Sequence, residues 1–138
     1  MSIMKDQIWK GDTFTIERRQ SLASNAVIFR FSGPFTARDM YSSLSPVALH
    51  NIFETEPPRP VPSVHIFDLT EVPYMDSCGL GLVIGHFVRC QNKGIRLIAA
   101  GVTRRVLDLF KTTKVDHLFP ITATVEEASS LQNPRTHS

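Results

Sequence analysis

Seven consecutive residues, Met75–Gly81, place a carboxylate, a hydroxyl, a thiol and two glycines together in the order MDSCGLG. The apolar run VHIFDL at 64–69 precedes this stretch, and the apolar run LVIGHFV at 82–88 follows it. The pattern predicts that residues 75–81 join the carboxyl end of a buried strand to the start of a helix. Ligands of open α/β sheets bind at such strand ends, and free N–H groups at a helix start attract anions. We therefore expect the chemistry of the protein to lie here.

A phosphate-binding loop is one chemistry that the glycines of this stretch could support. Gly79, Gly81 and Gly85 form the pattern G-x-G-x-x-x-G, which is one residue longer than the dinucleotide fingerprint, and no G-K-S/T follows. The spacing therefore favours structural roles. We predict that Gly79 allows a tight turn, and that Gly81 and Gly85, on one helix face, let the helix approach the sheet closely.

Covalent catalysis is a second chemistry, and the residues disfavour it. A nucleophile elbow requires G-x-S-x-G, but Met75 stands at the position of the first glycine. A phosphatase-like loop built on Cys78 would need an arginine where the sequence has Ile84. A serine- or thiol-dependent enzyme stays a minor hypothesis, and we predict that the protein is not an enzyme.

Ser77 has two compatible interpretations. Either Ser77 or Asp76 can cap the helix, which would contribute about 1 kcal/mol. A serine at a helix start is also accessible to a kinase, and a phosphate would add roughly −1.5 to −2 charges next to Asp76 and so alter a docking surface.

The composition limits the classes of protein to which the chain can belong. A length of 138 residues suits one domain, and a net charge of +2 without a long run of like charges argues against nucleic-acid binding. No apolar run reaches the length of about 18 residues that spans a membrane, and the N-terminus lacks the apolar core of a secretory signal. We therefore expect a cytoplasmic protein that does not engage a membrane.

The cysteines and histidines carry no recognised ligand pattern. Cys78 and Cys90 would lie about 18 Å apart along one helix, which is too far for a disulfide, so we expect reduced thiols. We predict no metal site and no cofactor, because the five histidines show no metal-ligand spacing: His50, His65, His86, His117 and His137. His65 lies on a buried strand and is predicted to be a core histidine.

The elements before the MDSCGLG stretch begin with an extension over residues 1–11, which Ile8 and Trp9 could dock. Residues 13–19 predict an exposed edge strand, and residues 25–33 a second strand that forms a hairpin with the first. In the second strand, Val27, Phe29 and Phe31 are predicted to face one way, and Ala26, Ile28 and Arg30 the other. A capping pattern at 36–39 starts a helix that carries Met40, Tyr41 and Leu44. A further helical turn over 46–53 and a proline-rich loop over 54–63 complete this half.

The elements after residue 63 alternate between strands and helices. Residues 64–69 and 95–101 predict buried strands, and the helix between them carries Leu80, Ile84 and Phe87 on one face, with Val83 and Val88 beside them. Gly94 is predicted to end this helix. A helix capped by Thr103 follows, with Val106, Leu109 and Phe110 on one face, then a short strand over 120–124 and a closing helix over 125–131. This order predicts an α/β fold with a mixed, mostly parallel sheet, an antiparallel N-terminal edge strand and about four helices.

Residues 64–128 resemble the STAS domain family, and most closely its stand-alone anti-sigma-factor antagonists from bacteria. The resemblance depends on the motif D-S-[ST]-G-L-G, which stands here as Asp76–Gly81, on the strand pattern from Gly94 to Ile98 and on the helix pattern from Val106 to Val115. In element order it extends over residues 12–128. It implies a single STAS-like domain between an extension at 1–11 and a polar tail at 129–138.

The resemblance also implies a function. Antagonists of this family bind an anti-sigma factor that is also a serine kinase, phosphorylation of the motif serine ends the binding, and a serine phosphatase resets it. Carried across, Ser77 is the phosphorylation site, and the partner-binding residues are Gly33, Pro34, Phe35, Thr36, Asp76, Cys78, Gly79 and Leu80.

This sequence departs from the family pattern at two of these places. Cys78 replaces the second hydroxyl of the motif, and Gly33–Thr36 lacks an acidic residue that this turn often carries. The alternative function is an accessory or scaffolding module of a transporter or a larger signalling complex, without phosphorylation.

Overall fold

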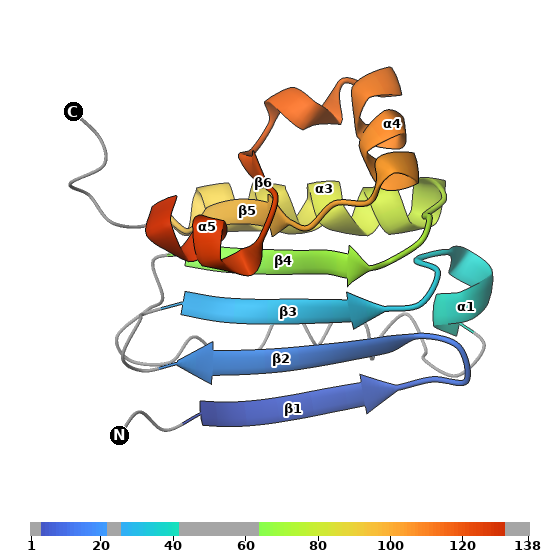
Figure 1. The fold of residues 1–138 in the computed structure, drawn as a ribbon, viewed down its shortest axis with the longest axis horizontal. Coiled ribbons are helices and arrows are strands. Elements are labelled where there is room, and N and C mark those ends of the chain that lie inside the picture. Colours follow the sequence, from blue (N-terminus) through green and yellow to red (C-terminus); the bar gives the residue numbers. More distant parts are fainter. Residues whose placement is uncertain (1–3, 22–25, 42–63, 132–138) are drawn as a thin grey trace.

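The structure is a computed structural model that describes residues 4–21, 26–41 and 64–131. Within these ranges, six strands form one sheet in the order β1-β2-β3-β4-β5-β6 (Figure 1). Strands β1 (Met4–Lys10), β2 (Thr15–Ser21) and β3 (Ala26–Ser32) are antiparallel neighbours. Strands β4 (Val64–Glu71), β5 (Arg96–Ala100) and β6 (Ile121–Thr122) continue the sheet in parallel with β3. The predicted α/β class with a mixed sheet is confirmed.

The N-terminal residues differ from the prediction. Residues 4–10 form β1, which pairs with β2, so the prediction of a loosely attached extension is wrong for residues 4–10. Strand β2, predicted as the edge, is instead an inner strand, and β1 takes the edge beside it. Strand β1 pairs with β2 along its whole length, from Met4 opposite Ser21 to Lys10 opposite Thr15.

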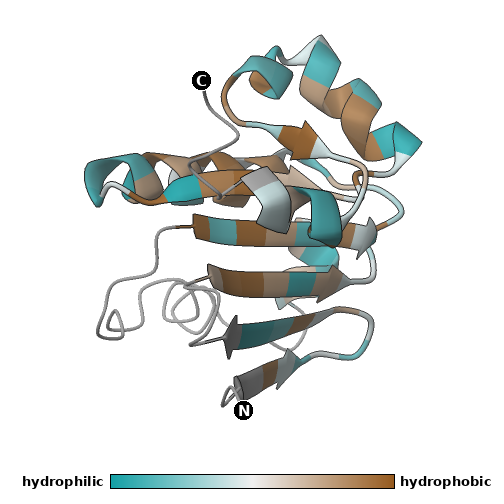
Figure 2. Ribbon diagram, turned by 60° about the vertical axis from the view of Figure 1, so that its left-hand side comes forward, coloured by the Kyte–Doolittle hydropathy of each residue, from teal (hydrophilic) through white to brown (hydrophobic). Residues whose placement is uncertain are grey.

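Two layers of side chains cover the sheet. Side chains alternate along β3, with Val27, Phe29 and Phe31 in the larger core and Ala26 and Ile28 in a smaller one, as predicted. The larger core lies under α3 (Ser77–Asn92) and α4 (Arg104–Thr112), and the smaller one lies under α5 (Val125–Leu131). Figure 2 shows the central strands as predominantly hydrophobic.

Helix α3 is defined by its two ends. Asp76 is the N-cap, and at the other end Ile95 N–H donates to Cys90 O (2.8 Å) while Gly94 N–H donates to Gln91 O (3.2 Å). Gly94 has φ +71°, so the helix ends in a Schellman motif, as its glycine predicted.

The buried face of α3 differs in part from the predicted one. Leu80 and Val83 are buried, but so are His86 and Cys90, whereas Val88 is 46% exposed. Ile84 and Phe87 only pack against the edge of the core. The buried face is therefore rotated toward His86, which polarity alone would have placed outside.

The remaining elements agree with the sequence pattern where they are described. Helix α1 (Ala37–Tyr41) buries Met40, and α4 buries Val106 and Phe110 with Leu109 against them. A short 3₁₀ turn, η1 (Val115–His117), leads to β6. Helix α5 continues to Leu131, so residues 129–131 belong to it rather than to a tail. The predicted turn at 46–53, the proline-rich loop and residues 132–138 lie outside the described residues.

No helix within the described ranges combines the length and the apolar character needed to cross a bilayer.

Candidate functional site

Two loops lie side by side at the carboxyl edge of the parallel strands. Gly33 N–H donates to Glu71 O (3.0 Å), Phe35 N–H to Tyr74 O (3.0 Å) and Asp76 N–H to Phe35 O (3.2 Å). Phe35 and Met75 also form a parallel bridge. The two loops are thereby fixed as an extension of the sheet, which brings the predicted residues of 33–36 next to those of 76–80.

The Asp76 carboxylate serves two helices at once. Its Oδ1 accepts hydrogen bonds from Cys78 N–H (3.0 Å) and Gly79 N–H (3.1 Å) at the start of α3. Its Oδ2 accepts a hydrogen bond from Ala37 N–H (3.0 Å), the first residue of α1. Of the two capping candidates in the sequence, Asp76 is the cap, and it also ties α1 to α3.

The start of α1 has a second set of hydrogen bonds. Asp39 N–H donates to Thr36 Oγ1 (3.1 Å), and the Thr36 hydroxyl donates to the Asp39 carboxylate (2.5 Å), as the capping pattern predicted. Thr13 donates to the other carboxylate oxygen of Asp39 (2.5 Å). The hydrogen bonds from Thr13 and then Thr36 lower the pKa of Asp39, so the carboxylate holds the β1–β2 connection against α1.

Of the three glycines near the start of α3, only Gly79 is required by close packing. A Cβ at position 79 would clash with the backbone oxygen of Phe35, so Gly79 allows α3 to touch the neighbouring loop. Gly81 has open space around it, and a Cβ at Gly85 would meet only Arg89 Nη1, at 3.7 Å. The prediction that Gly81 and Gly85 bring the helix close to the sheet is therefore wrong; the close approach of α3 is at Gly79, and it is made to the loop that carries Phe35.

Ser77 and Cys78 lie exposed at the first turn of α3. The Ser77 hydroxyl makes no hydrogen bond with the described residues, because Asp76 has taken the capping position. The adjacent Cys78 thiol is also free. An accessible hydroxyl therefore stands next to a carboxylate that already accepts hydrogen bonds from three backbone N–H groups.

The predicted partner-binding residues fall into two groups, those that reach solvent and those that are buried beneath them. Phe35 is 0% exposed, Leu80 is 8% exposed and Gly79 is buried, so these three lie beneath the surface and shape it. The remaining predicted residues reach solvent in part or fully: Gly33, Pro34, Thr36, Asp76 and Cys78. We name this accessible set, together with Ser77, the loop edge.

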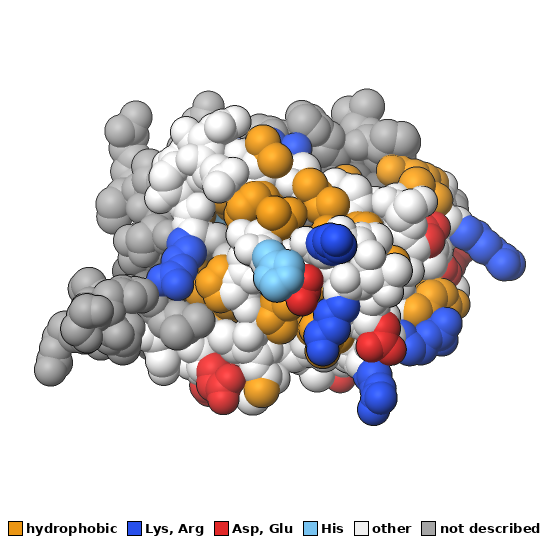
Figure 3. Space-filling view, turned by 90° about the horizontal axis from the view of Figure 1, so that it is seen from above, with side chains coloured by type: hydrophobic (Ala, Val, Ile, Leu, Met, Phe, Trp, Pro, Cys, Tyr) orange, Lys and Arg blue, Asp and Glu red, His pale blue; other side chains and the backbone are white. Residues whose placement is uncertain are grey.

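The start of α4 extends the loop edge. Thr103 occupies the N-cap position but makes no capping hydrogen bond, contrary to the prediction; its hydroxyl donates to Val72 O (2.8 Å) instead. That bond fixes the β5–α4 loop to the β4–α3 loop. Arg105 lies over the ring of Tyr74, 4.7 Å from its centroid, and Tyr74 is 38% exposed. Figure 3, which looks onto the molecule from the α4 side, shows Lys and Arg side chains beside apolar ones.

A second cluster of reactive side chains lies inside the larger core, between β4 and α3. His65 Nδ1 lies 2.9 Å from His86 Nε2 and 3.7 Å from Cys90 Sγ. The three potential ligand atoms all lie within 4.8 Å of one another, and no other such group of three is found among the described residues. The prediction that the histidines are scattered missed this cluster. His86 and Cys90, one helical turn apart on α3, were the signal that could have found it.

Burial determines the protonation of this cluster. Desolvation, with a smaller contribution from Arg18, lowers the pKa of His65 to about 4. Desolvation and then the charge on His65 lower the pKa of His86 to about 2. Burial raises the pKa of Cys90 to about 12. At neutral pH the two imidazoles are therefore uncharged, and one can donate its N–H to the lone pair of the other.

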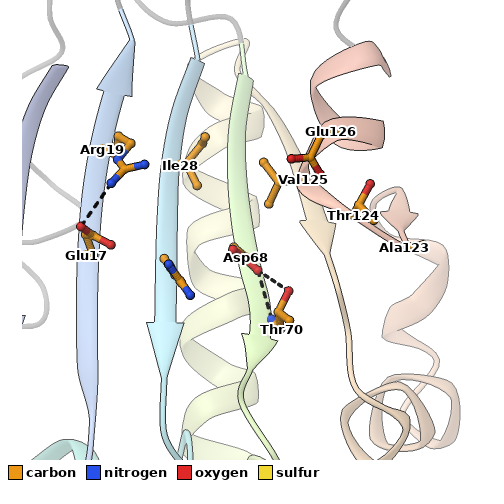
Figure 4. Close-up of a pocket in the computed structure, with 10 residues that line it drawn as sticks. Glu17, Arg19, Ile28, Asp68, Thr70, Ala123, Thr124, Val125 and Glu126 are labelled. Carbon is orange, nitrogen blue, oxygen red and sulfur yellow. Dashed lines mark hydrogen bonds and ion pairs between the residues drawn. The ribbon is translucent and has the colours of Figure 1, made fainter. Parts of the chain in front are cut away.

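A groove of about 420 Å³ lies on the opposite face of the sheet, beside α5 (Figure 4). Charged side chains of both signs line it, and several of them are satisfied locally: Glu17 pairs with Arg19 (3.6 Å), and Asp68 accepts hydrogen bonds from Thr70 N–H and Oγ1. The groove therefore has the character of a solvated sheet face, and the loop edge is the better candidate site.

Comparisons with known proteins agree with the fold. A family model described as the STAS domain matches residues 15–128. An anti-sigma-B factor antagonist from Listeria monocytogenes is 39% identical over 54 residues, which are 39% of this chain and 47% of the relative. The match to this relative thus spans only about half of its length.

Two solved structures are similar in fold. A sulfate transporter family protein from Wolinella succinogenes has a TM-score of 0.66 at 17% identity, over 83% of this chain and 89% of that one. An anti-sigma factor antagonist from Mycobacterium paratuberculosis has a TM-score of 0.57 at 16% identity, over 94% and 93%. Because the family match extends from β2 into α5 and includes both loops of the loop edge, the chain belongs to the STAS domain family.

Proposed function

We propose that this protein is an anti-sigma-factor antagonist: a cytoplasmic, non-enzymatic regulator that binds an anti-sigma factor with serine kinase activity through the loop edge. Phosphorylation of Ser77 ends the binding, and a serine phosphatase restores it. The name of the Listeria relative supports this class of function. The observation that carries the switch is the exposed Ser77 hydroxyl beside an Asp76 that already caps α3 and α1.

The occupied cap explains how a phosphate would act. A phosphate at a helix start is normally stabilised by free N–H groups. Here Asp76 already uses the N–H groups of Cys78 and Gly79. The new charge would therefore face a carboxylate without those donors, and it would have to be desolvated when a partner docks. The modification changes the docking surface rather than the fold of α3.

Mass spectrometry after incubation with the cognate kinase and ATP tests this proposal. We expect one phosphate per chain on Ser77, none on the Ser77→Ala variant, and unchanged phosphorylation of Ser130→Ala, which removes a hydroxyl on α5. In calorimetry, Ser77→Ala should bind the anti-sigma factor as tightly as the unphosphorylated wild type does. Ser77→Asp should weaken this binding by about 10-fold or more, which is about 1.4 kcal/mol or more. Phosphate on another residue would show that the site is assigned wrongly.

A transporter-linked accessory module is the second candidate, and the similarity of fold to the Wolinella protein is what favours it. This function requires no phosphorylation. Binding to a kinase-type partner that is equal for wild type and Ser77→Asp, with no phosphate incorporated, would favour this candidate over the antagonist.

A further inference from the structure

The cluster of His65, His86 and Cys90 contributes nothing to the loop edge, and its atoms have the arrangement of a ligand set. His65 projects from the amino end of β4, and His86 and Cys90 project from adjacent turns of α3. We propose that these three side chains bind one monovalent soft metal ion of the Cu⁺ class, held between β4 and α3.

The distances fit coordination to a single ion. Metal–nitrogen bonds of about 2.0–2.1 Å and metal–sulfur bonds of about 2.3 Å place neighbouring ligand atoms about 3.3–3.8 Å apart. The separation of Cys90 Sγ and His65 Nδ1 is 3.7 Å, which already lies in this range. The two histidine nitrogens are 2.9 Å apart, so they need to separate by about 0.4 Å when the ion replaces the hydrogen bond between them. The third pair, His86 Nε2 and Cys90 Sγ, lies within 4.8 Å, so these atoms need to approach by at most about 1 Å.

Aromatic rings hold the two imidazoles in position. The ring of Phe67 stacks on that of His86 at a centroid distance of 4.9 Å and an interplanar angle of 13°. Phe29 meets His65 (5.4 Å) and His86 (5.6 Å) edge to face. His86 and Cys90 are each 2% exposed, whereas His65 is partly exposed, so an ion would enter from the His65 side.

Charge selects a monovalent ion. The metal–sulfur bond forms as the Cys90 thiol releases its proton to solvent, so a Cu⁺–thiolate unit is neutral, whereas Zn²⁺ would leave one positive charge. That charge would lie in an apolar pocket under the field of Arg18 and Lys93, at a high desolvation cost. Thiolate and imidazole suit Cu⁺, and Zn²⁺ takes four ligands in structural sites, whereas the described residues supply three here.

Anaerobic titration of the full-length Cys78→Ser protein with Cu⁺, in competition with a Cu⁺ chelator, tests the proposal. This parent variant removes the exposed thiol, so that the remaining binding reports on Cys90. We expect one Cu⁺ per chain, and X-ray absorption should show one sulfur and two nitrogen ligands. Adding Cys90→Ser should lower the Cu⁺ affinity by at least about 100-fold. Loss of a residue that only hydrogen-bonds to a metal ligand costs about 10- to 100-fold, and loss of the ligand itself should cost more.

The matched control is His117→Gln in the same parent, because His117 is 81% exposed and lies outside the cluster; its Cu⁺ affinity should equal that of the parent. No Cu⁺ retained against the chelator, or no sulfur ligand in the absorption spectrum, would overturn the site. Tighter binding of Zn²⁺ than of Cu⁺ would overturn the monovalent assignment. The spectrum of the parent needs no further substitution, so the test stands even if Cys90→Ser fails to fold.

Discussion

At the scale of single residues, the motif divides its work between two neighbours. Asp76 accepts three backbone hydrogen bonds and joins two helices, and Ser77 is left exposed. Capping therefore falls to Asp76 alone, although the sequence allowed either residue to cap the helix. Under the proposed function, the Asp76 carboxylate would also repel a phosphate on Ser77.

Substitution of Asp76 by asparagine should separate the two capping interactions. Asparagine is as good a helix cap as aspartate, so the bonds to Cys78 and Gly79 can persist. Its amide N–H₂ would then face Ala37 N–H, donor against donor, and we expect a loss of about 1–3 kcal/mol in the free energy of unfolding. Urea denaturation measures this loss, with Asp108→Asn on the exposed side of α4 as the control. Equal stability of Asp76→Asn and wild type would show that the bond to α1 contributes nothing.

At the scale of elements, α3 does more than connect two strands. Its first turn exposes Ser77, and at Gly79 the helix packs closely against the loop that carries Phe35. Its buried side carries His86 and Cys90. The helix therefore links the loop edge to the larger core. A change that shifts α3 should affect both.

Two glycines in the first turns of α3 form a matched pair for testing this packing. Gly79→Ala should destabilise the protein because its Cβ would clash with Phe35 O, and a forced fit of this kind typically costs about 1–3 kcal/mol. Gly81→Ala meets no atom within 4 Å and should stabilise the protein by about 0.5–1 kcal/mol through its higher helix propensity. Opposite signs in thermal or urea unfolding would confirm the close contact; equal effects would contradict it.

At the scale of the whole molecule, parallel pairing gathers the loop edge at the carboxyl end of the parallel strands, whereas the titratable core cluster lies toward their amino end, between the start of β4 and the last turns of α3. Because the β3–α1, β4–α3 and β5–α4 loops all follow parallel strands, they meet at the same end. The cluster is enclosed by the larger core, so its protonation is coupled to global unfolding rather than to docking.

The two buried histidines predict a dependence of stability on pH. Their pKa values are lowered to about 4 and about 2 in the folded protein, so the unfolded chain, with values near 6.5, binds more protons below that pH. Folding stability is therefore complete above about pH 6.5 and falls as the pH decreases toward 4, by about 2 kcal/mol per histidine between pH 7 and pH 5.

Urea unfolding at pH 7 and pH 5 measures this loss. His86→Gln should reduce the difference between the two pH values by about the share of one histidine, about 2 kcal/mol. His117→Gln should leave the difference unchanged, because His117 is exposed. A wild-type stability that is the same at pH 5 and pH 7 would contradict the burial of neutral imidazoles.

The sequence by itself determined the elements whose pattern is local. Alternation in β3, the apolar run of β4, the Schellman glycine of α3 and the capping pattern at Thr36 were all predicted and are confirmed. Each of these features depends on neighbours within a few positions along the chain. The residues of the loop edge were anticipated in a different way, through the resemblance of the sequence to the STAS domain family.

Only the tertiary structure decided the features that depend on contacts between distant segments. Strand β1 exists because β2 pairs with it, Gly79 is required because Phe35 lies against it, and Thr103 bonds Val72 rather than its own helix. His65 and Cys90 are 25 positions apart in the sequence, and only the packing of α3 on β4 brings them together with His86. Local periodicity cannot report such contacts, because the free energy that favours them arises when two elements bury their faces against each other.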